Sequence, residues 1–281
     1  MRTTTCPPTP SPARTAALLI HGLGGTRHDF GVVYRQIGQT GIDTHAITLP
    51  GHGTTPDDLS DTRAEEWLDA VTTVYRKLLA QYDTVHVAGM CMGALLAILL
   101  CAREQHSVGR LVALSPPLRL DGWSLPWYQR LRHLLYVVPT LAARIKVEEK
   151  APYGIKNTQV RRIVESRFAR GDNSHYSWVP LACVREVDRL RRWTRREAAR
   201  IACPTLIVHA REDELTSLES ANQLQRRIPH AEVSVLENSY HMIGMDNDRK
   251  QVASQVNDFL LDHPSSGCRS MPMAQRVSRS T

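Results

Sequence analysis

Hydrophobic residues in this chain occur in short runs that alternate with longer segments of helical periodicity. Six runs have the length of strands, and several are continuously apolar, as expected for strands covered on both faces. These predicted strands are Ala16–Ile20, Thr44–Leu49, Thr84–Ala88, Arg110–Ser115, Thr205–Ala210 and Glu232–Leu236. Helical patterns lie between most of them, for example over Ala64–Gln81 and Met92–Ala102. Alternating strands and helices predict an α/β fold with a mostly parallel, doubly wound sheet and right-handed crossovers.

One gap interrupts this alternation. About ninety residues separate Ser115 from Thr205, whereas an ordinary crossover needs roughly a dozen or more. Four of the five tryptophans fall in this gap, among many arginines: Trp123, Trp127, Trp178 and Trp193. We therefore expect residues 119–200 to form a helical cap, inserted into a core made of residues 14–118 and 201–263. Ligands of open α/β sheets bind outside the carboxyl edge of the strands, so we expect the cap over that edge.

Composition supports a folded protein with polar ends. The 281 residues are 42% hydrophobic and 22% charged, which excludes global disorder. Residues 1–13 and 264–281 are polar and aperiodic, and we expect both to be flexible. No apolar run approaches the roughly 18 residues of a membrane span, and no signal-peptide core is evident near the N-terminus. We therefore expect a cytoplasmic protein without stable membrane insertion, whose six cysteines are reduced.

The net charge of +7 is concentrated in the predicted cap, where 18 Lys and Arg residues face 8 Asp and Glu residues. Such a concentration can favour anionic partners, but solvated faces of surface helices are the simpler interpretation. No recognised nucleic-acid-binding motif accompanies the charge, so we expect no nucleic-acid partner. The cysteines lack the close Cys/His spacing of a zinc site. We therefore expect no metal and no organic cofactor.

The segment "GMCMG", residues 89–93, has the glycine spacing of the nucleophile turn G-x-S-x-G, with Cys91 in the serine position. Gly89 and Gly93 permit a tight strand-to-helix turn that presents residue 91 at the top of the sheet. The N-terminus of the following helix and a nearby imidazolium would both favour a thiolate. The alternative for a free cysteine is a small buried hydrophobe, which we expect for Cys101 and Cys203. The glycine frame favours a nucleophile at Cys91.

Four motifs carry a wider resemblance: "LLIHGLGGT", "LPGHG", "GMCMG", and the pair "VHAREDE" and "NSYHMIGMD". Each is expected at a strand end, and the resemblance that they carry runs from about Ala16 to Leu261. With these motifs the chain resembles the α/β-hydrolase superfamily. Within it, the chain is similar to small bacterial carboxylesterases and monoacylglycerol lipases, which have serine where this chain has Cys91.

The resemblance implies a Cys-His-Asp triad in the chain order nucleophile, acid, histidine. His241 would take a proton from Cys91 and later pass it on, while Asp213 fixes the tautomer of the imidazole. The resemblance also implies an oxyanion hole made of the backbone N–H groups of Leu23 and Met92.

Three other carboxylates are alternatives for the acid: Glu212, Glu214 and Asp121. Glu212 and Glu214 flank Asp213 and are expected to point away from the site. Asp121 follows an earlier strand, a position that some lipases use for the acid. His21 is expected to support the first loop, and "LPGHG" is interpreted as loop architecture. Four further histidines are expected to be structural or exposed: His45, His52, His86 and His209.

We expect a hydrolase of carboxylic esters or thioesters that works through an acyl-Cys91 intermediate. The expected substrate is a small acyl ester or thioester, and linkage of the acyl group to a carrier protein or to CoA is one option. One alternative is an acyltransferase or condensing enzyme that uses the same acyl-Cys, because thioesters react readily with amines and thiols. Polyhydroxyalkanoate synthases and dienelactone hydrolases share the G-x-C-x-G turn, but the former are much longer and the latter lack a long cap. The other alternative is a hydrolase scaffold retained as a binding protein.

Overall fold

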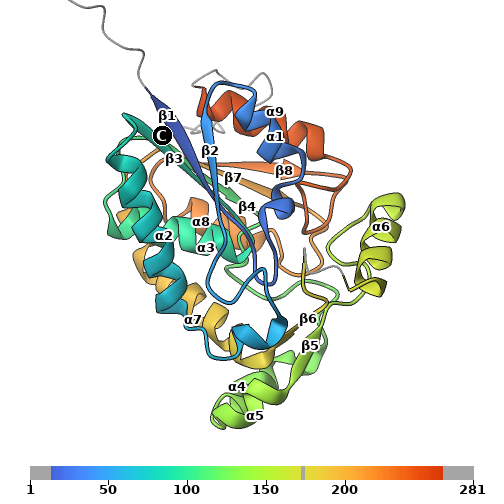
Figure 1. Ribbon diagram of the computed structural model, residues 1–281. Coiled ribbons are helices and arrows are strands. Elements are labelled where there is room, and N and C mark those ends of the chain that lie inside the picture. The colour runs from blue at the N-terminus through green and yellow to red at the C-terminus, as the bar shows by residue number, and fades with distance from the viewer. Residues whose placement is uncertain (1–13, 172–174, 262–281) are drawn as a thin grey trace, which may run out of the picture.

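The computed structural model describes residues 14–171 and 175–261 (Figure 1). The predicted flexible ends, 1–13 and 264–281, lie outside the described residues. The core is a six-stranded parallel sheet of order β2-β1-β3-β4-β7-β8. Its strands are β1 (Thr15–Ile20), β2 (Asp43–Ile47), β3 (Thr84–Met90), β4 (Leu111–Leu114), β7 (Thr205–Ala210) and β8 (Ala231–Leu236). All six predicted strands are present, and the predicted α/β architecture is confirmed.

The strand order creates a switch point between β1 and β3. The chain adds β2 on one side of β1 and then returns to add β3 on the other side. Ile20 of β1 is paired with Gly89 of β3, so both strands end at the same level. The loops that leave two such strands run in opposite directions and open a crevice at the sheet edge. The loop after β1 and the turn after β3 therefore lie side by side.

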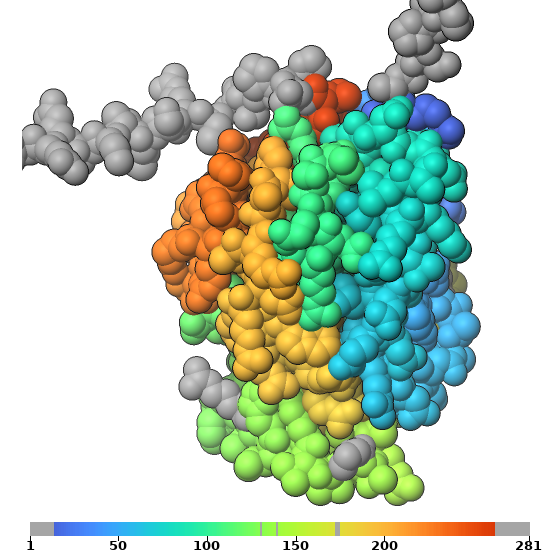
Figure 2. Space-filling model, turned by 90° about the vertical axis from the view of Figure 1, so that its left-hand side faces the viewer, coloured from blue at the N-terminus to red at the C-terminus, as the bar shows by residue number. Residues whose placement is uncertain are grey.

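Helices cover both faces of this sheet. On one face lie α1 (Val32–Gly38) and α9 (Arg249–Leu260), and on the other lie α2 (Ala64–Leu79), α3 (Met92–Arg103) and α8 (Glu219–Gln225). A helix that is apolar on every side must be buried. Accordingly, α3 is buried from Met92 to Ala102, with the sheet on one side and α2 and α7 (Leu181–Glu197) on the others. Figure 2 shows the molecule from the side of these helices.

The segment between β4 and β7 adds small elements at the carboxyl end of the sheet, where Figures 1 and 2 show it as a protruding layer. These elements are α4 (Arg132–Leu135), α5 (Pro139–Arg144), β5 (Lys146–Glu148), α6 (Thr158–Ala169) and β6 (Trp178–Pro180), followed by α7. Short 3-10 turns occupy Arg27–Phe30, Pro56–Leu59, Trp127–Leu131 and Ala198–Arg200. The antiparallel pair β5–β6 was not predicted, because strands of three residues carry no readable alternation.

The proposed core–cap division stays a prediction, and α7, which it assigns to the cap, packs against α3. Among the described residues, no helix combines the length and apolar character needed to cross a bilayer.

Two glycines allow α3 to begin against the end of β1. A Cβ atom on Gly93 would lie 2.0 Å from the carbonyl oxygen of Ile20, and one on Gly89 would lie 2.1 Å from the carbonyl oxygen of Gly93. Backbone atoms cannot yield at such distances, so both positions require glycine. Between them, Cys91 has φ 53° and ψ −121°, in the region that favours glycine. The tight packing of this turn holds Cys91 in that conformation.

Replacing Gly93 with alanine is expected to lower the free energy of unfolding by about 3 kcal/mol or more, because α3 would have to move away from β1. Urea unfolding followed by circular dichroism measures this change. Gly38→Ala is the matched control: a Cβ there would lie an ordinary 3.6 Å from Thr44 Oγ1. The control is expected to keep or slightly increase stability. A Gly93→Ala protein as stable as the control would contradict the close approach.

Candidate active site

Cys91 stands at the junction of β3 and α3. Its backbone N–H donates to the carbonyl oxygen of Leu114 at 2.9 Å, and its side chain is partly exposed to solvent. The first turn of α3 leaves unpaired N–H groups that favour negative charge at this position. The backbone of Cys91 is therefore fixed, and the residue is only partly buried.

His241 and Asp213 form a buried pair. His241 Nδ1 lies 2.7 Å from Asp213 Oδ2, and Asp213 Oδ1 accepts the N–H groups of Leu215 and Thr216 at 2.9 and 3.0 Å. Burial alone would raise the pKa of Asp213, but His241, His209 and the backbone donors outweigh it and lower the pKa. The carboxylate is therefore ionised and fixes the orientation of the imidazole.

Cys91 lies close enough to the same imidazole to affect its pKa. Burial lowers the pKa of His241, but Asp213 and Cys91 together overcome this and hold it well above its ordinary value. Nε2 of His241 is buried and makes no conventional hydrogen bond within the described part of the chain. Catalytic hydrogen bonds are often long before substrate binds. The structure thus brings the three predicted triad residues together from the ends of β3, β7 and β8.

Two alternative acids are occupied elsewhere. Asp121 Oδ2 lies 2.6 Å from Nε of Arg119, and its other oxygen accepts a backbone N–H. Glu212 pairs with Lys156 at 2.7 Å. Neither carboxylate bonds to His241, which leaves Asp213 as its partner.

The expectation that Glu214 points away from the site is wrong. Its side chain is buried, and Oε2 accepts the backbone N–H of His241 at 3.1 Å. The cause is the turn after Asp213, whose carboxylate binds the next N–H groups and folds Glu214 back toward the His241 loop. Burial is the main cause that raises the pKa of Glu214, to about 7.

The loop after β1 places Leu23 beside Cys91. A Cβ on Gly22 would lie 3.2 Å from the Cβ of Cys91, so the two segments are in contact. Within this loop the Gly25 N–H donates to Gly22 O at 3.3 Å, and no such bond involves the Leu23 N–H in the described ranges. Met92 is the first residue of α3, where a backbone N–H has no partner within the helix. Both predicted oxyanion donors therefore belong to segments that border Cys91.

Asp29 supports this loop and was missed by the sequence analysis. Its buried carboxylate accepts the Gly22 N–H at 3.0 Å, and a Cβ on Gly25 would lie only 1.9 Å from Oδ2. The carboxylate thus fills the space beneath the glycines. The available signal was an acidic residue seven positions after the His-Gly pair, which has no meaning until the loop is folded.

His21 supports the same loop from the other side, as predicted. Its Nε2 accepts the Leu49 N–H at 3.1 Å, so Nδ1 carries the proton and donates to Gly22 O at 2.8 Å. The "LPGHG" segment beginning at Leu49 is thereby tied to the first loop. A surface hollow borders this segment, and neither Cys91 nor His241 lines it.

Residues of the 119–200 segment bind the first loop. The Tyr176 N–H donates to Gly24 O at 2.8 Å, and the Tyr176 hydroxyl accepts the Thr54 N–H at 3.0 Å. His175 Nδ1 lies 3.4 Å from Asp29 Oδ1. These contacts connect the predicted cap directly to the loop that carries Leu23.

The His241 loop is held in a similar way. Ser115 Oγ donates to the carbonyl oxygen of His241 at 2.8 Å. The buried carboxylate of Asp246 accepts the N–H groups of Tyr240, Lys156 and Asn157 at 2.7 to 2.8 Å. One carboxylate therefore fixes both the histidine loop and the segment from 156 to 157.

Proteins of known structure share this fold. A structure reported for LipS and LipT, two metagenome-derived lipolytic enzymes, is similar with a TM-score of 0.76 and 21% identity, over 89% of this chain and 95% of that one. The Paleococcus ferrophilus monoacylglycerol lipase is similar with a TM-score of 0.74 and 19% identity, over 90% and 97%. At such identities the similarity concerns the fold.

Sequence comparison extends over the same region. A thermostable monoacylglycerol lipase of Bacillus sp. (strain H-257) is 24% identical over 88% of this chain and 90% of the relative. A Bacillus subtilis (strain 168) carboxylesterase is 24% identical over 87% and 92%. Residues 11–248 match the hydrolase family described as serine aminopeptidase, S33. That match covers most of the chain and includes all three strand ends of the candidate site, so the chain belongs to this hydrolase family.

Proposed function

We propose that this protein hydrolyses carboxylic esters or thioesters with Cys91 as the nucleophile. The observation that carries the proposal is the arrangement of Cys91, His241 and Asp213, with the 2.7 Å bond between the last two. Family membership and the lipase and carboxylesterase relatives support ester hydrolysis. The acyl-Cys step is inferred from the position of Cys91 alone.

In the first half-reaction, His241 accepts the proton of the Cys91 thiol and the sulfur attacks the carbonyl carbon of the substrate. The carbonyl oxygen becomes negative and accepts hydrogen bonds from the Leu23 and Met92 N–H groups. Collapse breaks the bond to the alcohol or thiol, which leaves with the proton from His241. The acyl group remains on Cys91 as a thioester.

In the second half-reaction, His241 accepts a proton from water, and the resulting hydroxide attacks the thioester. The Cys91 sulfur leaves and is protonated by His241, which releases the carboxylic acid and restores the enzyme. Asp213 stabilises the imidazolium formed in each half-reaction, consistent with the raised pKa of His241. The oxygen and both protons consumed come from water, so no cofactor enters the balance.

The surface of the predicted cap supports a substrate with an apolar acyl chain. Large apolar side chains are exposed there, and Trp127 is 87% exposed. The others are Trp123, Tyr128, Leu131, Leu134, Val137, Val138 and Leu141. Clusters of exposed apolar side chains can mark a surface that binds an apolar ligand. The relatives named monoacylglycerol lipases agree with such a chain.

Cys91→Ala is expected to reduce turnover of p-nitrophenyl butyrate and octanoate by roughly a thousandfold or more, because no nucleophile remains. Intact mass spectrometry of the unmodified enzyme is expected to show an acyl adduct that maps to Cys91. Cys183→Ser is the matched control, because Cys183 is buried and its side chain only donates to Leu59 O. Turnover in Cys91→Ala equal to that of the control would sink the mechanism.

Two further measurements separate the alternatives. In the first, the enzyme is given an acyl-CoA together with an amine or thiol acceptor. An acyltransferase is expected to form the acylated acceptor, whereas a hydrolase forms the free carboxylic acid. Iodoacetamide labelling of Cys91 no faster than that of a free thiol, combined with absent turnover, would favour a binding scaffold.

The buried carboxyl of Glu214 is expected to make stability depend on pH. Its folded-state pKa of about 7 exceeds the ordinary 4.5, so the folded protein binds the extra proton between these values. The free energy of unfolding should therefore fall as pH rises through this window, by roughly 3 kcal/mol in total. Glu214→Gln keeps an acceptor for the His241 N–H and should remove this decline.

Urea unfolding at pH 5, 6, 7 and 8 measures the effect, and Glu232→Gln on the exposed side of β8 is the control. An unfolding free energy whose pH dependence is the same in Glu214→Gln and in the control would contradict the burial of this charge.

A further inference from the structure

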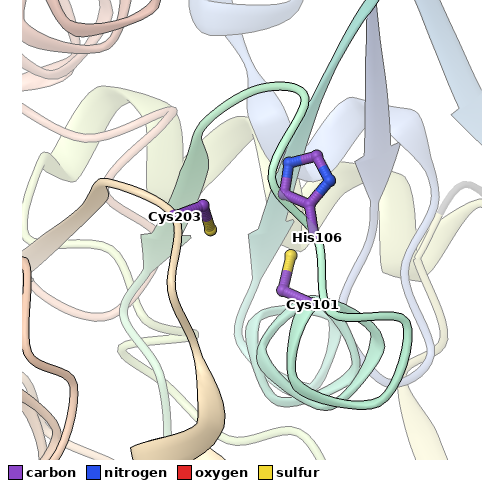
Figure 3. A group of neighbouring side chains, drawn as sticks. All are labelled: Cys101, His106 and Cys203. Atoms are coloured by element: carbon purple, nitrogen blue, oxygen red, sulfur yellow. The ribbon is translucent and has the colours of Figure 1, made fainter.

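Three buried side chains converge at the far end of α3. Cys101 lies in the last turn of this helix, His106 in the loop that follows it, and Cys203 just before β7 (Figure 3). They are 1%, 1% and 2% exposed. One ligand atom from each residue lies within 4.8 Å of the other two. The fold therefore gathers two sulfurs and one imidazole in a space closed to bulk solvent.

The histidine of this cluster has one nitrogen occupied and one unoccupied. Nδ1 of His106 lies 2.7 Å from the hydroxyl oxygen of the buried Tyr75. Nε2 is buried and has no hydrogen-bond partner among the described residues. Metal-binding histidines commonly have this arrangement, in which an outer partner fixes the ring and the other nitrogen binds the ion. An unpaired buried nitrogen is otherwise costly.

The spacing suits a tetrahedral ion after a small adjustment. Zn–S bonds of about 2.3 Å and Zn–N bonds of about 2.0 Å put neighbouring ligand atoms roughly 3.5 to 3.8 Å apart. The ligand atoms now lie at most 4.8 Å apart. They must therefore move about 1 Å closer to one another to bind the ion. Rotation of the two cysteine side chains can supply such a shift without moving the backbone.

The electrostatic setting agrees with cation binding. Burial lowers the pKa of His106 to about 4, so its imidazole is neutral and has a free lone pair. A hydrogen bond from Cys101 lowers the pKa of Cys203, while burial raises the pKa of Cys101. The two sulfurs therefore lie close enough to interact, and a bound cation would displace the protons of both thiols.

We propose that Cys101, His106 and Cys203 bind a thiolate-preferring divalent cation, zinc in the first instance, with a small ligand such as water in the fourth position. Binding releases the protons of the two thiols and leaves the metal with two thiolates and one neutral imidazole. This proposal departs from the expectation that the chain holds no metal. The linear spacing gave no indication, because Cys203 follows Cys101 by about a hundred residues and only the sheet brings them together.

The ion would be structural. The twelve residues of α3 extend roughly 18 Å, and Cys91 lies at the opposite end of the helix. A metal bound here connects the end of α3 to the start of β7 and takes no part in the reaction at Cys91. The proposal is therefore independent of the proposed function.

Cobalt titration of the full-length, reduced protein tests the site. One equivalent of Co²⁺ is expected to produce thiolate-to-metal charge-transfer absorption and the visible bands of a tetrahedral ion, both abolished by Zn²⁺. Cys101→Ser, Cys203→Ser and His106→Gln are each expected to weaken binding at least tenfold. Cys183→Ser and Cys91→Ala, which alter other cysteines, are expected to bind as the unmodified chain does.

Thermal unfolding checks that the variants are folded and supplies a second readout. Zn²⁺ is expected to raise the Tm of the unmodified chain and of both controls, and to leave the three cluster variants unchanged. Ester turnover is measured in parallel and is expected to stay unchanged when Zn²⁺ is removed. Failure of the metal-site proposal can therefore be distinguished from failure of the acyl-Cys mechanism. Absence of charge-transfer bands in folded, reduced protein would overturn the site. The site would also be overturned by bands that persist in both cysteine variants, or by a Cys101–Cys203 disulfide in protein saturated with metal.

Discussion

The close contact between the start of α3 and the end of β1 is the constraint on which the site depends. It requires backbone to touch backbone at Gly93 and Ile20, and no side chain fits between them. Because α3 cannot retreat, Cys91 is held at a positive φ and its neighbour Met92 begins the helix beside the first loop. The loop after β1 can then approach Cys91 across Gly22. This single contact therefore brings Cys91 next to the two segments that carry the predicted oxyanion donors, Leu23 and Met92.

Much of the fold was predictable, because it rests on local patterns. Buried parallel strands give continuous apolar runs, and α3 gives an apolar helix next to a glycine-framed turn. The predicted partners Asp213 and His241 follow strands β7 and β8, and parallel strands bring their carboxyl ends to one edge. Their places after these strands, together with the resemblance to α/β-hydrolases, therefore led to the expectation that they lie together.

What the sequence did not reveal depends on contacts between distant segments. Asp29 acquires its role only when its carboxylate lies beneath Gly22, and Glu214 only when the turn after Asp213 folds it back. Three-residue strands such as β5 carry no periodicity. In each case the information lies in how the loops pack rather than in residue type or spacing.

Asp246 has a consequence for how this protein can change. Its buried carboxylate holds Tyr240, one residue before His241, together with the backbone of Lys156 and Asn157. Any remodelling of the chain path near 156 would therefore also disturb the loop that carries His241. By contrast, Trp127 and Leu134 are solvent-facing, so substitutions at such positions can change the surface of the predicted cap without moving the histidine loop.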